Sequence, residues 1–434
     1  MASFFYTLIA IVAYLFNPFA GFGVFCTLAL LNYSLGEGDY LFRSLKLLII
    51  SLPLYMTPIL PGLPVLGSWT TVMLIVVSTQ LLNKRLRFKP LDLYLWAVFC
   101  LSSVVTILLS FGAIKEVYYT VQIALLFLPP SLALLACKSG RCPATKKENQ
   151  NLLFPLAGAV AATAVGVLIQ WVLHNRFGVS VGHIAFFQNR VTYDLLIPAY
   201  SALSALLSIG LPMGPVLWRA GKPVAAIALP LLSGIAILVN TSRTGFVAGA
   251  FGLLIVLLFP PHRENRLHDL LLLVPTGGFM LWLFGKVTNL SRFQSSNLWS
   301  GNGRLETYVS GYELWTQYPR YVLFGRGYAD YPTTPPHNFL LETLVCSGLV
   351  VTMALAVWLL RFATTTWGTY WCHLFFTYAA ASMFFSGFYN FKPLAILLVV
   401  AFLSIAPHKP TARQPVSLTS HHETSRPQKG IHAQ

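Results

Sequence analysis

Apolar stretches separated by short polar stretches recur along almost the whole chain. A transmembrane helix needs roughly 20 predominantly apolar residues, and the chain has twelve stretches close to that length. They cover residues 44–60, 67–83, 91–112, 116–136, 152–173, 191–212, 223–239, 244–260, 269–285, 338–360, 371–388 and 393–406. The apolar segment 4–33 is interrupted at Asn17-Pro18, which predicts either one kinked span or a helical hairpin. The pattern therefore predicts 12–14 transmembrane helices.

The composition agrees with this pattern. Hydrophobic residues make up 56% of the 434 residues and charged residues 10%, whereas soluble proteins carry about 25% charged residues. A chain of this size with so few charged residues would not stay dissolved in water. This composition excludes a soluble enzyme, a disordered protein and a secreted disulfide scaffold. We predict an all-α polytopic membrane protein. Residues 1–406 would form the transmembrane domain, and the polar residues 407–434 a disordered cytoplasmic tail.

The positive charges indicate how the chain is oriented. Its net charge of +16 does not lead us to expect a nucleic-acid partner, because basic residues mark the cytoplasmic loops of membrane proteins. If Lys84 and its basic neighbours are cytoplasmic, the short loops on that side carry fifteen Lys and Arg, and the opposite short loops carry five. One long segment, at about 286–336, then lies on the outer side. A long loop in an otherwise economical chain usually carries function.

Three residues stand out because the outer side is poor in positive charge. Arg190 precedes a predicted span, Arg243 lies in the very short turn 240–245, and His337 opens another span after two prolines. A guanidinium binds two phosphate oxygens at once, and the helix that follows Arg243 adds the positive end of its dipole. Arg243 therefore predicts an anion site. The alternative for this residue is a side chain that extends to lipid headgroups.

His337 and two carboxylates are candidates for proton transfer. An imidazole titrates near neutral pH and can take a proton from a hydroxyl; alternatively, His337 caps a helix or lies in the interface. Asn338 and Glu342 are four residues apart and share one helix face. A carboxylate at the depth of Glu342 is costly in a membrane and is therefore a functional candidate, as is Asp194 just inside the predicted span 191–212. Either carboxylate alternatively pairs with an arginine for structural reasons.

The long outer segment adds arginines and aromatic residues. Arg304, Arg320 and Arg326 are candidate contacts to a glycan or a phosphate, and the alternative for each is a solvated side chain. Residues 302–315 predict an amphipathic helix on the outer membrane surface. The tyrosines and tryptophans of this segment either stack on sugar rings or form the aromatic belt of the interface.

One motif resembles a known family of membrane enzymes. O-antigen ligases carry His-Asn, nine further residues and a glycine, and three residues later a Gly, Thr or Tyr. Here His337, Asn338 and Gly348 match this motif, whereas Val351 departs from it at the last position.

Two further segments resemble the superfamily that joins O-antigen ligases, O-antigen polymerases and related exopolysaccharide polymerases. The turn Thr241-Ser242-Arg243-Thr244-Gly245 is similar to its central motif, and Gly325-Arg326-Gly327 is similar to its Gly-x-Gly run before His-Asn. The resemblance implies a GT-C-like glycosyltransferase of the bacterial inner membrane with its active site facing the periplasm. Its donor would be a glycan on undecaprenyl pyrophosphate, and its acceptor lipid A-core or another glycan.

The resemblance also implies roles for individual residues. Arg190 and Arg243 would match the arginines that hold the pyrophosphate, and His337 the essential histidine. Cations placed there would stabilise the departing diphosphate, and we expect no metal or cofactor, because no acidic cluster faces outward. The predicted catalytic residues are His337, Arg243 and Glu342. The predicted contacts to pyrophosphate or glycan are Arg190, Arg243, Arg304, Arg326 and Asn338.

The motifs serve ligases and polymerases alike, so both functions stay open. The His-Asn-x9-Gly match favours a ligase that transfers the glycan to lipid A-core, and the alternative is a polymerase that joins repeat units. A polysaccharide-lipid transporter is a further alternative. It would predict inverted repeats and ionisable residues near the midplane, whereas the conspicuous charges here gather at one face.

Overall fold

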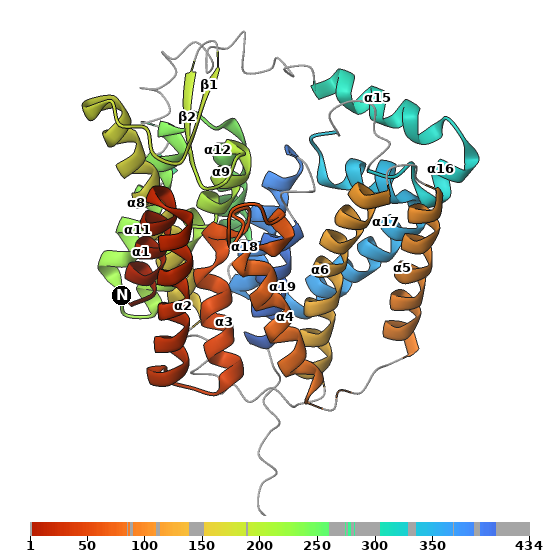
Figure 1. Ribbon diagram of the computed structural model, residues 1–434, viewed down its shortest axis with the longest axis horizontal. Coiled ribbons are helices and arrows are strands. Elements are labelled where there is room, and N and C mark those ends of the chain that lie inside the picture. Colours follow the sequence, from red (N-terminus) through yellow and green to blue (C-terminus); the bar gives the residue numbers. More distant parts are fainter. Residues whose placement is uncertain are drawn as a thin grey trace, which may run out of the picture.

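The computed structural model describes residues 2–84, 86, 90–109, 113–138, 152–187, 190–259, 304–328, 336–367, 369–385 and 391–404, together with residues 274, 277, 278 and 282. These parts are mostly helical (Figure 1). The helices are α1 (Ala2–Phe16), α2 (Pro18–Leu35), α3 (Tyr40–Ile50), α4 (Trp69–Leu82), α5 (Pro90–Leu109), α6 (Ala113–Lys138), α8 (Leu153–Phe177), α9 (Tyr200–Ser208), α10 (Gly214–Arg219), α11 (Pro223–Val239), α12 (Arg243–Leu258), α15 (Arg304–Thr316), α16 (Pro319–Phe324), α17 (Phe339–Thr366), α18 (Tyr370–Ser382) and α19 (Phe391–Ser404). Short 3-10 turns cover Leu52–Leu54, Val65–Gly67 and Leu211–Met213.

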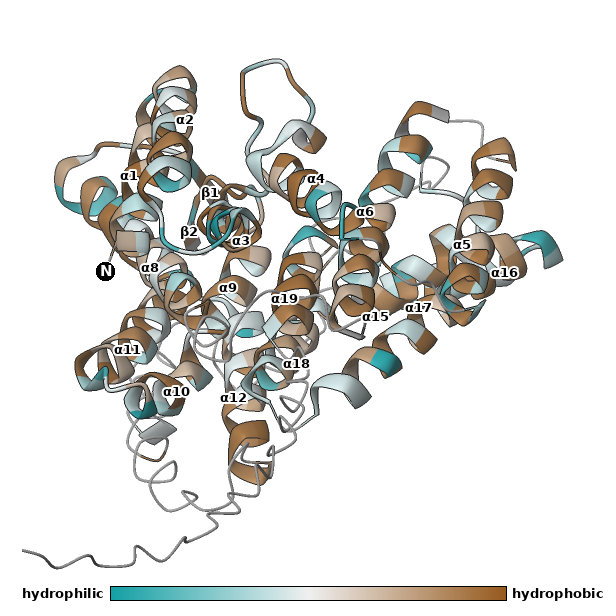
Figure 2. Ribbon diagram, turned by 90° about the horizontal axis from the view of Figure 1, so that it is seen from below, coloured by the Kyte–Doolittle hydropathy of each residue, from teal (hydrophilic) through white to brown (hydrophobic). Residues whose placement is uncertain are grey.

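Six of the described helical segments are long and apolar enough to cross a membrane. They are Pro18–Leu35, Pro90–Leu109, Glu116–Cys137, Leu153–Phe177, Tyr200–Arg219 and Phe339–Thr366. Five shorter apolar helices, among them α12 and α19, pack with them. Hydrophobic segments also dominate the helices in Figure 2. These features agree with the prediction of a polytopic helical membrane protein.

The interrupted N-terminal segment forms two helices. Asn17 is the N-cap of α2, where its side-chain oxygen accepts a hydrogen bond from the N–H of Phe19 at 2.8 Å. Pro18 follows at the first helical position, where the missing N–H costs nothing. Because α1 and α2 contact each other, the segment matches the hairpin alternative and not the single kinked span.

Two of the predicted spans are wrong in part. Residues 191–195 do not begin a helix; they belong to strand β2 (Arg190–Leu195), which pairs antiparallel with β1 (His183–Phe187). Helical structure starts only at Tyr200, because the run Val-Thr-Tyr favours a strand and Pro198 disfavours a helix before it. In the span 44–60, α3 ends at Ile50, shortly before Pro53.

Two other predicted regions lie outside the described residues. They are most of the span 269–285 and the tail 407–434, of which no residue is described. Within the long outer segment, however, the predicted amphipathic helix is confirmed as a helix, because α15 runs from Arg304 to Thr316.

Small residues on α12 allow its neighbours to approach closely. A Cβ atom on Gly249 would lie 2.2 Å from Leu211 Cδ1, and a Cβ atom on Gly252 would lie 2.3 Å from Thr377 Oγ1. This is the close helix packing that small residues permit in membranes.

The β1–β2 hairpin, α15 and α16 lie at one end of the helical bundle in Figure 1. We call this the outer end. The opposite end holds the start of α5 and the ends of α4 and α6, and we call it the inner end. The helices alternate in direction between the two ends, so residues far apart in the sequence meet at the outer end.

Candidate functional site

Arg243 is the first residue of α12, directly after a tight turn at the outer end. Ser242 caps this helix, and its hydroxyl accepts the N–H of Gly245 at 3.4 Å. Thr241 has a φ of +48°, an uncommon conformation for a β-branched residue. Gly245 is also required, since a Cβ atom there would lie 2.9 Å from Ile237 and from Ser204. The turn therefore fixes Arg243, whose side chain is partly exposed, at the positive end of the helix dipole.

The β1–β2 hairpin is attached to this turn by one buried side chain. The Asn240 side chain accepts the N–H of Tyr193 through Oδ1 at 2.7 Å and donates from Nδ2 to the Tyr193 carbonyl at 3.1 Å. Asn240 is completely buried. Because β2 begins with Arg190, the same strand that Asn240 holds also carries Arg190. The side chain of Arg190 lies outside the described part of the chain.

His337 and Asn338 stand at the start of α17. Asn338 is the N-cap of this helix, and its side-chain oxygen accepts the N–H of Leu341 at 3.0 Å. The Tyr308 hydroxyl, from α15, lies 3.2 Å from the His337 carbonyl and 3.4 Å from the Met383 carbonyl. The long outer segment thus lies against the start of α17. The side chains of His337 and Asn338 are both partly exposed.

An apolar groove of about 740 Å³ runs between α12, which Arg243 begins, and α17, which begins two residues after His337. Val247 of α12 lines it, and this residue lies one helical turn below Arg243 on the same face. Phe339 and Leu340 of α17, directly after His337, line the opposite side. The remaining walls come from α18, α19 and the lower part of α17. Arg243 and His337 do not line the groove themselves; they precede the residues of α12 and α17 that line it.

Helix α17 is interrupted at Gly348, and the Gly-x-Gly segment fills the interruption. Gly348 has φ +78° and ψ 177°, which is not helical. The N–H of Arg326 bonds to the Val345 carbonyl at 2.8 Å, and the N–H of Gly327 bonds to the Cys346 carbonyl at 3.0 Å. The break would otherwise leave these carbonyls without partners in an apolar environment. Two motifs that the sequence singled out separately therefore form one structural unit.

The side chains of the loop arginines lie in different places. The guanidinium of Arg326 donates to the Gln317 side chain at 3.1 Å and lies 5.6 Å from the centre of the Tyr321 ring. Arg320 packs on Tyr321 as well and is exposed. Arg304 begins α15, and its side chain lies outside the described residues.

Glu342 is completely buried and is absent from the described walls of the groove. It faces α6, where the buried Tyr119 lies within electrostatic range of both Glu342 and Glu116. A carboxylate oxygen of Glu116 accepts the N–H of Tyr328, and the Tyr119 and Tyr328 rings stack with centres 4.5 Å apart. Glu116 therefore holds Tyr328, the residue after the Gly-x-Gly segment, against α6.

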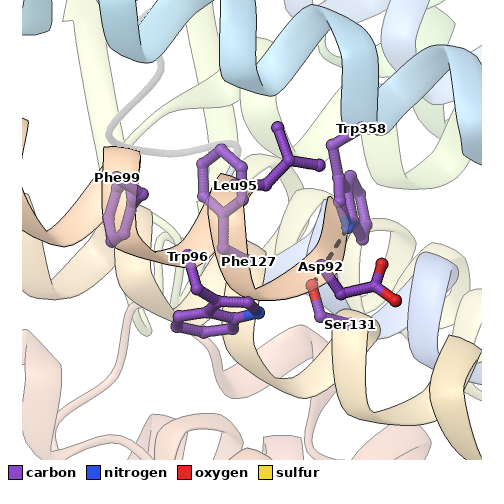
Figure 3. Close-up of a pocket in the computed structure, with 7 residues that line it drawn as sticks. All are labelled: Asp92, Leu95, Trp96, Phe99, Phe127, Ser131 and Trp358. Carbon is purple, nitrogen blue, oxygen red and sulfur yellow. Dashed lines mark hydrogen bonds between the residues drawn. The ribbon is translucent and has the colours of Figure 1, made fainter. Parts of the chain in front are cut away.

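The inner end has a hollow of only about 10 Å³, shown in Figure 3. Trp358 points toward Ser131 and donates to its hydroxyl at 3.0 Å. Asp92 forms an ion pair with Arg361 next to this hollow. Because a single water needs about 10–15 Å³, the hollow has no room for a substrate, and the outer end is the better candidate.

Two residues that hold the segments around this site, Asn240 and Glu116, belong to no motif in the sequence, and the β1–β2 hairpin was not predicted. Their positions could be found only from contacts between distant segments. Among the described residues, no group of three or more His, Cys, Asp or Glu side chains is placed to hold a metal ion.

Comparison of the chain with protein-family models, with curated proteins and with solved structures found no match.

Proposed function

We propose that this chain is a membrane glycosyltransferase that moves a glycan from undecaprenyl pyrophosphate to lipid A-core, in the manner of an O-antigen ligase. One observation carries the proposal: α12, which begins with Arg243, and α17, which begins two residues after His337, line the same groove near their N-termini, through Val247 and Phe339. A cation, an imidazole and two helix N-termini at the mouth of an apolar groove suit a lipid with a diphosphate headgroup.

The chemistry of the leaving group explains why these side chains would serve. Cleavage of the bond between the anomeric carbon and the diphosphate leaves negative charge on the phosphate oxygen. A preorganised guanidinium lowers the energy of that transition state more than that of the bound donor. In this reaction Arg243 grips the diphosphate, with Arg190 on the adjoining strand as a second cation. The polyprenyl chain lies in the apolar groove below.

The charge distribution supports a periplasmic site. At the inner end, α4 is followed by Lys84, α10 ends with Arg219 and Arg361 lies in the last turns of α17. Basic residues mark the cytoplasmic side, so the outer end faces the periplasm in the bacterial inner membrane. This arrangement accommodates the 12–14 spans and the GT-C-like organisation with one long periplasmic loop that the sequence predicts.

A polymerase that joins repeat units is the second candidate, and the departure at Val351 from the ligase motif favours it. Both enzymes use the same donor and the same site, and they differ only in the acceptor. A transporter is a weaker candidate, because it would place ionisable residues in a site near the midplane, whereas the described walls of the groove hold no charged residue.

The test is a transfer reaction with the purified full-length chain in lipid nanodiscs. The donor is an undecaprenyl-pyrophosphate-linked glycan, and lipid A-core is present or absent. A ligase forms a conjugate with lipid A-core, whereas a polymerase lengthens the donor glycan without it. We expect His337→Ala to remove transfer while the melting temperature stays near the wild-type value. If the wild-type chain forms neither product, the proposal is wrong.

A further inference from the structure

A histidine and a carboxylate face each other across the β1–β2 hairpin. The Nδ1 atom of His183 lies 3.1 Å from the Oδ2 atom of Asp194. The hydroxyl of Thr192 donates to the same oxygen at 3.2 Å. The pair lies where the strand register shifts between His183 and Ile184, so the two side chains meet at an irregular point of the ladder.

The two partners differ greatly in exposure. The His183 side chain is 46% exposed, whereas that of Asp194 is 2% exposed. When Nδ1–H donates to a carboxylate, the tautomer is fixed and the lone pair remains on Nε2. A buried carboxylate also stabilises the imidazolium that forms when Nε2 takes a proton. The arrangement is that of an oriented general base open to an external hydroxyl.

The hairpin that carries this pair is attached to the turn that precedes Arg243. Asp194 follows Tyr193, whose N–H and carbonyl both form hydrogen bonds with the Asn240 side chain. Asn240 precedes Arg243 by three residues, which is at most about 11 Å of chain. The hairpin itself stands at the outer end of the bundle (Figure 1).

From this geometry we infer that His183 is the general base for the acceptor hydroxyl and that Asp194 is its positioning residue. The inference rests on the proposed glycosyl transfer. The acceptor O–H gives its proton to His183 Nε2 as its oxygen forms the bond to the anomeric carbon. The bond between that carbon and the diphosphate oxygen breaks, and its electron pair leaves with the diphosphate, which Arg243 holds. The role left to His337 is contact with the diphosphate.

The test compares variants of the full-length chain in nanodiscs by initial rates across a range of pH and acceptor concentrations. His183→Gln should lower kcat by about 10²- to 10⁴-fold, the usual contribution of general base catalysis, with little change in the KM for acceptor. The wild-type kcat should fall as the pH is lowered, because a protonated base accepts no proton, and the variant should lack this decrease. Binding of undecaprenyl pyrophosphate without a glycan should stay within about twofold, because binding needs no base.

His174→Gln is the matched control. His174 lies at the end of α8 with Nδ1 3.2 Å from the Ser180 hydroxyl, and its ring packs near Phe186 of the hairpin. We expect the kcat of this variant to stay within about twofold of the wild-type value. The His174 ring contacts a hydroxyl and not a buried carboxylate, so nothing stabilises its imidazolium as Asp194 does for His183.

Thr192→Val keeps both His183 and Asp194, and it is the second test of the pair if His183→Gln does not fold. It removes one hydrogen bond to Asp194 and should lower kcat by about tenfold. The role of His183 would be overturned if His183→Gln kept the wild-type kcat and pH profile. If only Thr192→Val folds, an unchanged kcat in that variant would overturn it. Either result would leave the proposed transferase intact. If the wild-type chain transfers no glycan, both the role of His183 and the proposed transferase function are wrong.

Discussion

The backbones of Gly325 and Gly348 are in direct contact where the long outer segment meets α17. A Cβ atom on Gly325 would lie 2.3 Å from the Cys346 carbonyl oxygen, and a Cβ atom on Gly348 would lie 2.3 Å from the Leu323 carbonyl oxygen. Both glycines have positive φ, at +79° and +78°. Neither position therefore accepts a side chain. The contact between the two glycines places the Gly-x-Gly motif directly against the His-Asn-x9-Gly motif.

We predict that Gly348→Ala lowers the melting temperature strongly and reduces the yield of folded protein. The conformation of Gly348, with φ +78° and ψ 177°, is essentially restricted to glycine, and a residue with a Cβ atom there costs about 1–3 kcal/mol. The clash with the backbone adds to this cost. Gly178→Ala is the control, because Gly178 has φ +68° but open space around its Cβ position. Thermal unfolding in detergent measures both. If the two variants lose the same stability, the close approach at Gly348 contributes nothing.

Much of the helical framework could be predicted from hydropathy. The helices α5, α8, α11 and α12 each fall within about three residues of a predicted apolar stretch, because a membrane span needs a long apolar run and short polar turns. The turn before Arg243 was predicted from the same pattern. The capping of α12 by Ser242 follows from a residue type that favours this position.

The β1–β2 hairpin and the break at Gly348 could not be predicted in this way. Residues 191–195 are as apolar as a helix end, and hydropathy does not distinguish a short strand from the first turn of a span. The break at Gly348 depends on N–H groups supplied by residues about twenty positions earlier. The groove between α12 and α17 likewise depends on side chains from four helices, so sequence placed Arg243 and His337 at one face but not at one groove.

We predict that Arg243→Ala lowers glycan transfer by about 10²- to 10³-fold, the typical cost of removing one preorganised charge from a transition state. Arg243→Lys should also be poor, since a point charge does not reproduce the planar fork of a guanidinium. Arg176→Ala is the matched control, because Arg176 is an exposed arginine in the last turn of α8. Initial rates of transfer measure all three. A fully active Arg243→Lys would indicate that charge alone suffices.

We predict that Asn240→Ala releases the β1–β2 hairpin from α12. The substitution leaves the N–H and carbonyl of Tyr193 without their partners, at a cost of about 1–3 kcal/mol for each buried group. Hydrogen exchange of residues 183–195, followed by mass spectrometry, should become faster, and transfer should decrease. Asn175→Ala is the control, because Asn175 donates to the Tyr193 hydroxyl at 2.6 Å and to the Trp171 carbonyl at 2.9 Å, and not to the hairpin backbone. Unchanged exchange in Asn240→Ala would contradict the attachment.

We predict that Ala380→Trp fills the groove and raises the KM for the lipid-linked donor. Ala380 lines the groove on α18, and an indole there takes up volume that the polyprenyl chain would occupy. Ala250→Trp is the control, since Ala250 lies on the exposed side of α12 and does not belong to the groove wall. Transfer at several donor concentrations separates KM from kcat. An unchanged donor KM in a folded Ala380→Trp would indicate that the lipid binds elsewhere.

We predict that the ion pair between Asp92 and Arg361 stabilises the inner end without taking part in transfer. Asp92 is 5% exposed, and removing one partner of a buried pair typically costs about 3–5 kcal/mol, because the other charge remains buried. Asp92→Ala should therefore lower the melting temperature, and the double variant Asp92→Ala with Arg361→Met should recover part of the loss. Among folded molecules the transfer rate should stay near the wild-type value, since the pair lies at the opposite end from Arg243. A selective loss of transfer with unchanged stability would instead assign the inner end a part in the reaction.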